Sequence, residues 1–170
     1  MLPHSFLPDG RFVMGGRRFC RTDVVEYRKV LQDNLKVGRN MKNYCLKIGQ
    51  GRHKIFLHAV ACGTDWNVAI FGGERDHIGA VACGIPTLIH GNPDRPTVSL
   101  SSFCVPGHKD DVLARKAADM LARALSQVVA VTVGFHVEQA DQEDLRILCE
   151  YSLEACQRLL LRIREDGDDA

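Results

Sequence analysis

The hydrophobic pattern of the chain changes its period near Pro106-Gly107-His108. Before this break, from residue 42 on, short apolar and β-branched runs alternate with turn-forming residues, which is typical of strands. After it, apolar residues recur every three or four positions, which is typical of amphipathic helices. Strands first and helices later predict an α+β fold rather than alternating β-α units.

Five strand-like runs precede the break, and turn-forming residues such as Gly63-Thr64-Asp65 separate them. The runs span residues 44–48, 54–62, 66–71, 78–85 and 97–105. Short strands joined by turns predict consecutive hairpins and a largely antiparallel sheet. A sixth run, 128–137, is nearly all apolar, so we expect it in the centre of the sheet.

Two helical segments flank this sixth run. The first places Leu113, Ala117 and Leu121 on one face. Asp141 is a good N-cap for the second, whose predicted inner face consists of Leu145, Leu148, Cys149, Ser152, Cys156, Leu159 and Ile163. We therefore predict a sheet of about six strands with two main helices packed on one face.

The first forty residues differ from the rest. Residues 1–16 are rich in Pro and Gly and have no apolar period, so they predict an irregular arm. Residues 22–35 can form a short helix capped by Thr22. The expected organisation is an N-terminal extension over 1–40, an α+β domain over 41–164 and a frayed acidic tail over 165–170.

Composition excludes several classes of protein. The 170 residues suit a single domain, and 22 basic residues against 21 acidic ones lack the excess of a general nucleic-acid or membrane-surface binder. No apolar run approaches the roughly 20 residues that cross a bilayer, and Pro3 and Pro8 interrupt any signal peptide. We expect a cytoplasmic protein with no nucleic-acid or membrane partner.

The chain has seven cysteines, an odd number, and none of them has CxxC spacing. This pattern indicates neither a disulfide framework nor a zinc ribbon. We expect reduced thiols buried as small hydrophobic side chains. Cys104, close to Gly107 and His108, is the one for which a functional role stays open.

The first candidate motif is Gly72-Gly73 followed by His77-Ile78-Gly79. It lies between two predicted strands, whereas the dinucleotide fingerprint and the P-loop both need a helix to follow. Paired glycines allow the backbone to approach a ligand closely, a phosphate included. The alternative is a plain hairpin turn.

The second motif, His108-Lys109-Asp110-Asp111, opens a helix. A helix N-terminus can hold an anion, and Lys109 adds positive charge. The two aspartates oppose this reading, because they can simply be acids of the first turn or its cap.

The third motif is Gly134-Phe135-His136-Val137, at the end of the predicted central strand. His77, His108 and His136 thus all lie at element ends, whereas the other histidines, His53 among them, have no such context. If those ends converge, three imidazoles can bind a divalent metal or hold a phosphate. No nucleophile elbow is present.

In their order and spacing, the three motifs resemble the small D subunit of gallate-type phenolic acid decarboxylases, also described as the LpdD-like prenylated flavin chaperone domain. The resemblance runs from about Met41 to about Leu161. It implies an accessory protein, rather than a stand-alone enzyme, that binds prenylated FMN. Such a protein is expected to act as chaperone or carrier in cofactor delivery or maturation for the large subunit of a UbiD-type, hydroxyaryl or gallate-like decarboxylase.

The resemblance also implies a binding site, formed by Gly72, Gly73, His77, Gly79, His108, Lys109 and His136. It assigns Lys109 and the Gly72-Gly73 backbone to the phosphate, and the three histidines to the flavin or to a bridging divalent metal. Two alternatives stay open. One is a metal-dependent enzyme that uses His77, His108 and His136; the other is a purely structural decarboxylase subunit. Exposed sheet edges are also compatible with a homodimer.

Overall fold

The computed structural model describes residues 5–6, 12–14, 17–19, 42–88 and 96–168. The chain divides into two compact units, Met1–Asn40 and Met41–Ala170. In the first unit, β1 (Ser5–Phe6), β2 (Phe12–Met14) and β3 (Arg17–Phe19) form an antiparallel sheet. β1 and β2 lie within residues 1–16, for which the sequence predicts an irregular arm. The helix predicted over 22–35 lies outside the described residues.

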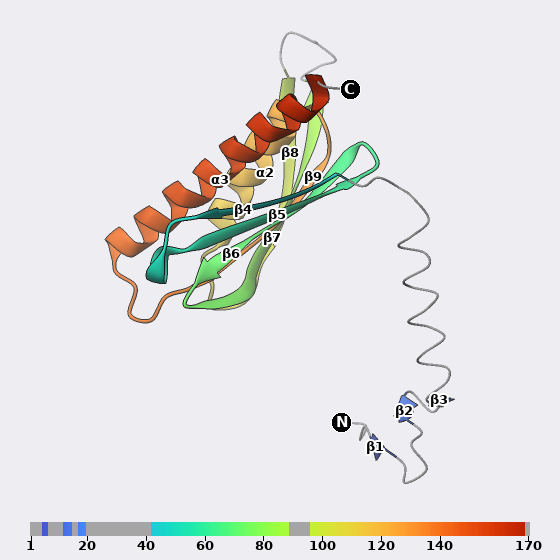
Figure 1. Ribbon diagram of the computed structural model, residues 1–170, viewed down its shortest axis with the longest axis vertical. Coiled ribbons are helices and arrows are strands. Elements are labelled where there is room, and N and C mark those ends of the chain that lie inside the picture. Colours follow the sequence, from blue (N-terminus) through green and yellow to red (C-terminus); the bar gives the residue numbers. More distant parts are fainter. Residues whose placement is uncertain (1–4, 7–11, 15–16, 20–41, 89–95, 169–170) are drawn as a thin grey trace. The chain divides into compact units, whose positions relative to one another are not determined.

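The second unit contains one six-stranded sheet and two long helices (Figure 1). Its elements in chain order are β4 (Asn43–Ile48), the 3₁₀ helix η1 (Gly51–His53), β5 (Ile55–Cys62), β6 (Asp65–Gly73), β7 (Arg75–Leu88), β8 (Pro96–Cys104), α2 (Asp111–Leu125), β9 (Val129–His136) and α3 (Gln142–Asp168). Both helices lie on the same face of the sheet. The predicted α+β class, strand number and helix layer are confirmed.

The strand order is β4-β5-β6-β9-β7-β8, and every neighbouring pair is antiparallel except β6 and β9. β9 therefore separates two strands that follow each other in the chain, and the prediction of hairpins throughout is wrong at the β6–β7 link. The predicted central position of β9 is confirmed. Its side chains Val129, Val131 and Val133 are at most 1% exposed, as expected for an apolar strand in the centre of a sheet.

The core lies between the sheet and the helices. Alternate residues of the strands, such as Ile55, Leu57 and Ile70, are fully buried beneath Leu121 of α2 and Leu159 of α3. The strands bury every second residue and the helices bury one residue in every three or four, and these side chains together form one apolar layer.

The inner face of α3 differs in part from its prediction. Leu148, Ser152, Cys156 and Leu159 are buried as expected, but Leu145 is 54% exposed and Cys149 is also exposed. The buried residue of the first turn is instead Asp144, and its contact with His53 sets the rotation of the helix there.

The acidic end is also more ordered than predicted. α3 continues to Asp168, and the Tyr44 hydroxyl donates a hydrogen bond of 2.6 Å to the Asp166 carboxylate. Burial and this neighbouring carboxylate raise the pKa of Tyr44 to about 12. The prediction that the chain frays from residue 165 on is therefore wrong for residues 165–168.

The expectation that the cysteines are buried as a group is wrong. Among the described cysteines, Cys156 is buried, Cys83 and Cys104 are half-buried, and Cys45, Cys62 and Cys149 are exposed. In the described residues, no helix has both the length and the apolar character that crossing a membrane requires.

Candidate functional site

Four segments that are distant in sequence meet at one end of the sheet. The start of β7 pairs with the end of β9, since Arg75 lies opposite His136. The end of β8 lies beside the same part of β7, since Cys104 pairs with Ala80, and the chain then turns into α2. We call this the histidine end of the sheet, because His77, His108 and His136 all lie there.

A β-bulge shapes this end. Asp76 lies opposite Phe135 and Ala80 lies opposite Val133, so residues 77–79 of β7 face Gly134 alone. A Cβ atom at position 134 would lie 2.1 Å from the His77 carbonyl oxygen. Only glycine lets β7 come this close to β9. The bulge leaves Ile78 exposed and holds the His77 side chain half-buried.

The half-buried His77 side chain meets two side chains from the segment before α2. Its Nε2 lies 3.0 Å from Nδ1 of His108. Oδ2 of Asp110 lies 3.8 Å from the same His77 nitrogen and 3.5 Å from Nδ1 of His108. We call these three residues the histidine–aspartate cluster. The sequence points to both histidines, but it offers Asp110 only as an acid of the helix start.

Asp110 occupies the N-cap position of α2 without capping it, because its side chain makes no cap hydrogen bond. Its carboxylate instead fills the space above Gly79, where a Cβ atom would lie 1.9 Å from Oδ2. Burial raises the pKa of Asp110, while His77, His108 and a hydrogen bond from the Phe135 backbone act in the opposite direction. Gly79 is thus the residue that makes room for the carboxylate.

Cys104 holds the loop that carries His108. Its thiol donates toward the carbonyl oxygens of His108, at 3.1 Å, and of Gly79, at 3.4 Å. The Val105 N–H also donates to the Gly79 carbonyl oxygen, at 2.7 Å. These contacts join the end of β8 to the bulge, which gives Cys104 a structural position behind the cluster.

His136 lies beside the cluster but has other partners. Its ring centroid is 6.5 Å from that of His77. Its Nε2 lies 2.6 Å from an Arg75 guanidinium nitrogen and 3.2 Å from the Glu138 carboxylate. The hydrogen bond with His136, followed by the charge of the nearby Arg75, lowers the pKa of Glu138. In the described residues, the ligand atoms that lie within 4.8 Å of one another belong to His77, His108 and Asp110, and His136 is not part of this group.

The Gly72-Gly73 pair approaches the backbone of its own protein. Gly73 has a φ of 76°, and its N–H donates to the Lys54 carbonyl oxygen at 2.9 Å. A Cβ at Gly72 would lie 2.1 Å from that same oxygen. The next N–H, of Glu74, donates to the His136 carbonyl oxygen at 2.7 Å. The two glycines thus allow neighbouring backbone segments to pack closely at this end of the sheet, and the Gly73 N–H is already bonded to Lys54. Lys109 is exposed next to the cluster.

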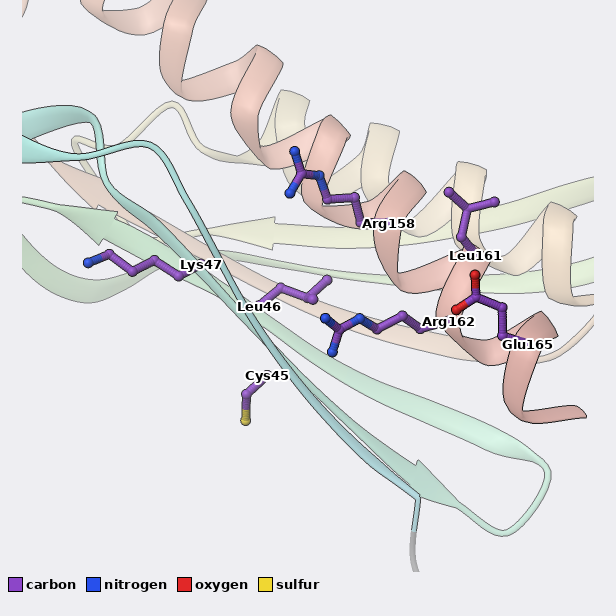
Figure 2. A pocket seen from close by; sticks show the side chains of 7 residues that line it. All are labelled: Cys45, Leu46, Lys47, Arg158, Leu161, Arg162 and Glu165. Carbon is purple, nitrogen blue, oxygen red and sulfur yellow. The ribbon is translucent and has the colours of Figure 1, made fainter. Parts of the chain in front are cut away.

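Two surface grooves lie apart from the cluster residues. One, with a volume of about 310 Å³, runs between β4 and the last turns of α3 (Figure 2). Its lining includes three basic side chains, Lys47, Arg158 and Arg162. The other, of about 430 Å³, lies between α2 and β8 and is lined by Leu100, Asp111, Val112, Arg115, Lys116 and Asp119. Three basic side chains against one acidic side chain, Glu165, thus give the first groove a positive charge.

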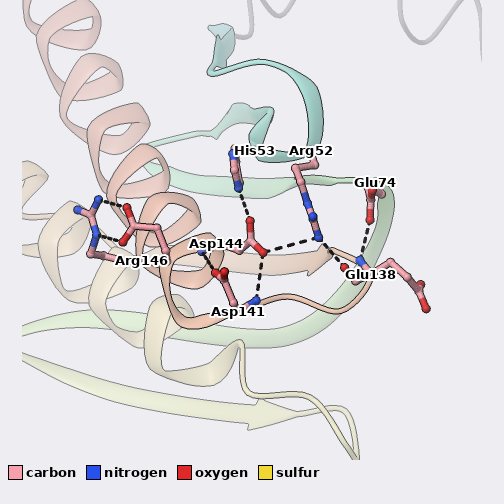
Figure 3. A network of polar contacts seen from close by, with 8 residues as sticks. Arg52, His53, Glu74, Glu138, Asp141, Asp144 and Arg146 are labelled. Atoms are coloured by element: carbon pink, nitrogen blue, oxygen red, sulfur yellow. Dashed lines mark hydrogen bonds and ion pairs between the residues drawn. The ribbon is translucent and has the colours of Figure 1, made fainter.

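Sequence reasoning missed a polar network beside the histidine end (Figure 3). The His53 Nε2 lies 2.6 Å from an Asp144 carboxylate oxygen, and the Arg52 guanidinium lies 3.6 Å from the other. Arg52 also donates to the Glu138 carbonyl oxygen. The hydrogen bond with His53, followed by one from the Asp141 N–H, lowers the pKa of Asp144. The sequence predicts Asp141 as the N-cap of α3, and its carboxylate does accept a hydrogen bond from the Asp144 N–H. Nothing in the sequence links Arg52 or His53 to this cap.

The fold and the cluster define a small α+β domain with a polar site at one end of its sheet. A family model described as the prenylated flavin chaperone LpdD-like domain matches residues 49–164, which include the bulge, the cluster, α2 and α3 as far as residue 164. The chain belongs to this family, and the resemblance read from its motifs is confirmed.

Comparison with solved structures gives a more distant likeness. A chain from a chaperone complex for assembly of the yeast 20S proteasome aligns over 68% of this chain and 99% of its own, with a TM-score of 0.42 and 7% identity. So low a similarity carries no functional argument. No curated protein matches the chain at a significant level.

Proposed function

We propose that this protein binds prenylated FMN and carries it to a UbiD-type decarboxylase of hydroxyaryl or gallate-like acids, where it assists cofactor delivery or maturation. Membership of the prenylated flavin chaperone family is the observation that carries this proposal. A chaperone for a cofactor needs a site for the cargo and a partner enzyme that receives it.

The histidine end of the sheet is the proposed cargo site. A flavin mononucleotide combines a polar ring edge with a phosphate, so its carrier needs hydrogen-bonding side chains and a cation. Here His77 and His108 are partly exposed, at 24% and 34% of their side-chain area, beside the exposed Lys109. Lys109 also directly precedes the N-cap residue of α2, at the helix end where the dipole favours an anion.

Each residue of this site has a proposed role. Lys109 pairs with the phosphate, and His77, His108 and the adjacent His136 face the flavin. The Gly73 N–H is already bonded to Lys54, so we leave the Gly72-Gly73 backbone out of the phosphate contacts. These glycines, together with Gly79, are proposed to shape the site by permitting close packing.

An anaerobic titration of the protein with reduced prenylated FMN tests this proposal, with FMN as the comparison ligand. We expect tighter binding of the prenylated form and a 10- to 100-fold weaker affinity for Lys109→Ala, since a hydrogen bond to a charged group contributes about 1.5–3 kcal/mol. Lys47→Ala is the matched control, because it removes a lysine from the groove between β4 and α3, away from the proposed cargo site.

The outcomes separate the alternatives. Loss of affinity in Lys47→Ala with no change in Lys109→Ala would move the cargo site to the groove between β4 and α3. Absence of binding to the wild-type protein would contradict the carrier role and favour a structural subunit.

A second candidate function, a metal-dependent enzyme, is favoured by the two-histidine, one-carboxylate composition of the cluster. This candidate requires turnover of an aromatic acid by the isolated protein. Assay with added divalent metal and no decarboxylase partner distinguishes it from the carrier, which is inactive alone.

A further inference from the structure

We propose that His77, His108 and Asp110 form a binding site for one divalent transition-metal ion with the coordination preferences of Zn²⁺. The proposal goes beyond the carrier role and does not depend on it. It replaces the three-histidine set expected from the sequence with a set of two imidazoles and one carboxylate.

The distances between the three ligand atoms carry the proposal. They form a triangle with sides of 3.0, 3.5 and 3.8 Å, whose circumscribed radius is about 2.0 Å. An ion a few tenths of an ångström above that plane would lie about 2.1 Å from each atom, which matches Zn–N and Zn–O bonds of about 2.0–2.2 Å. The ligands would need no large movement.

The backbone already holds the ligands in this arrangement. The bulge over Gly134 fixes the strand at His77, and Gly79 leaves room for the Asp110 carboxylate. The Cys104 thiol holds the carbonyl of His108. Such support around the ligands is what distinguishes a built metal site from side chains that meet by chance on a surface.

Burial and charge agree with this assignment. The Asp110 side chain is only 14% exposed, and it faces two histidines at 3.5 and 3.8 Å rather than a lysine or an arginine. A carboxylate largely withdrawn from water is stabilised by a neighbouring positive charge. A divalent ion would supply that charge and would also occupy both facing ring nitrogens.

The alternative is a hydrogen-bonded triad without metal. In it, one ring nitrogen carries a proton and donates to the other across the 3.0 Å separation of His77 and His108. A metal requires both nitrogens to be unprotonated, so the two arrangements exclude each other.

Three protein ligands leave at least one coordination position open on a four- to six-coordinate ion. Water or an anionic oxygen can take that position, because both imidazoles reach solvent. A ligand phosphate is an oxygen donor of this kind; that step alone rests on the proposed function.

The test uses the full chain without a histidine tag, treated with a chelator and then titrated with Zn²⁺ by calorimetry and with Co²⁺ by visible absorption. We expect one ion per chain and Co²⁺ ligand-field bands. His77→Ala, His108→Ala and Asp110→Asn should each weaken the affinity at least 100-fold. His136→Ala and His58→Ala should change it less than 3-fold, because His136 bonds to Arg75 and His58 lies elsewhere, in β5.

Thermal unfolding of each metal-free variant establishes that it is folded. If the alanine variants do not fold, Asp110→Asn still provides the test, because asparagine keeps the shape of the side chain. Lack of stoichiometric binding by the wild-type protein, or equal binding by the Asp110→Asn variant, would overturn the metal site and leave the hydrogen-bonded triad. Flavin titration in chelator is a separate measurement, so failure of the metal site and failure of the carrier role remain distinguishable.

Discussion

Opposite Gly134, β7 carries two more residues than a regular ladder with β9 requires. The His77 carbonyl oxygen and the Gly79 nitrogen both press against this position, at 2.1 and 2.9 Å from where a Cβ would be. A single missing side chain therefore allows the bulge that brings His77 to His108 and Asp110.

We expect Gly134→Ala to lower the free energy of unfolding by about 1–3 kcal/mol, the usual cost of overpacking, because backbone atoms must move. The displaced bulge should also weaken any ligand binding at the cluster. Urea denaturation measures the stability, with Gly167→Ala as control, since a Cβ there meets nothing within 4 Å. An unchanged midpoint for Gly134→Ala would show that the bulge does not depend on this glycine.

Asp144 makes stability depend on pH at acidic values. Its hydrogen bond with His53, and then that from the Asp141 N–H, lowers its pKa in the folded state. A carboxyl group with a lowered folded pKa stabilises the fold above its unfolded value, about 3.9, and this contribution disappears as the pH falls through the folded value.

The stability difference between the wild-type protein and Asp144→Asn should therefore shrink as the pH falls below 4. Urea denaturation across acidic pH values measures it, with the exposed Glu165→Gln as the comparison variant. A difference that persists undiminished at pH 2 would contradict a role for the Asp144 charge.

At the scale of elements, the start of α3 depends on its cap. Asp141 accepts a hydrogen bond of 2.8 Å from the Asp144 N–H, and the Asp144 side chain accepts one of 3.1 Å from the Asp141 N–H. This reciprocal pair is a capping box. It joins the helix to the loop after β9, and so to the histidine end of the sheet.

Asp141→Ala should lower the free energy of unfolding by about 1 kcal/mol, because an N–H of the first turn loses its acceptor. Asp141→Asn retains an acceptor and should lie within about 0.5 kcal/mol of the wild-type protein. Chemical denaturation compares the two variants; equal losses would mean that charge, and not capping, is the contribution of Asp141.

The elements themselves could be predicted because each buries one face, and a buried face leaves a period in the sequence. The rotation of α3 about its axis could not be predicted, because it depends on the long-range contact of Asp144 with His53. This rotation leaves Leu145 exposed to solvent. The insertion of β9 between β6 and β7 was equally inaccessible, because the hydrophobic period does not encode which strands become neighbours.

The site was predictable to the same extent. His77 and His108 lie at the ends of elements, where functional polar residues are common, and the structure brings the two side chains together. Asp110 looked like a helix-start residue, and only the bulge register, which no local pattern encodes, shows that its carboxylate faces the two rings.

At the scale of the whole second unit, one end of a single sheet gathers polar groups from η1, β7, β9 and the segments that precede α2 and α3. The sheet and the two helices hold these groups in place. A polar site on a small α+β domain agrees with membership of a prenylated flavin chaperone family.

Transfer of the cargo tests the carrier role most directly. The protein is loaded anaerobically with reduced prenylated FMN, freed of unbound cofactor by gel filtration and mixed with a cofactor-free UbiD-type decarboxylase. We predict that decarboxylase activity appears in proportion to the loaded protein added, and that Lys109→Ala carries little cofactor through the column. If the wild-type protein retains no cofactor on the column, or retains it and yields no active decarboxylase, the carrier account is contradicted.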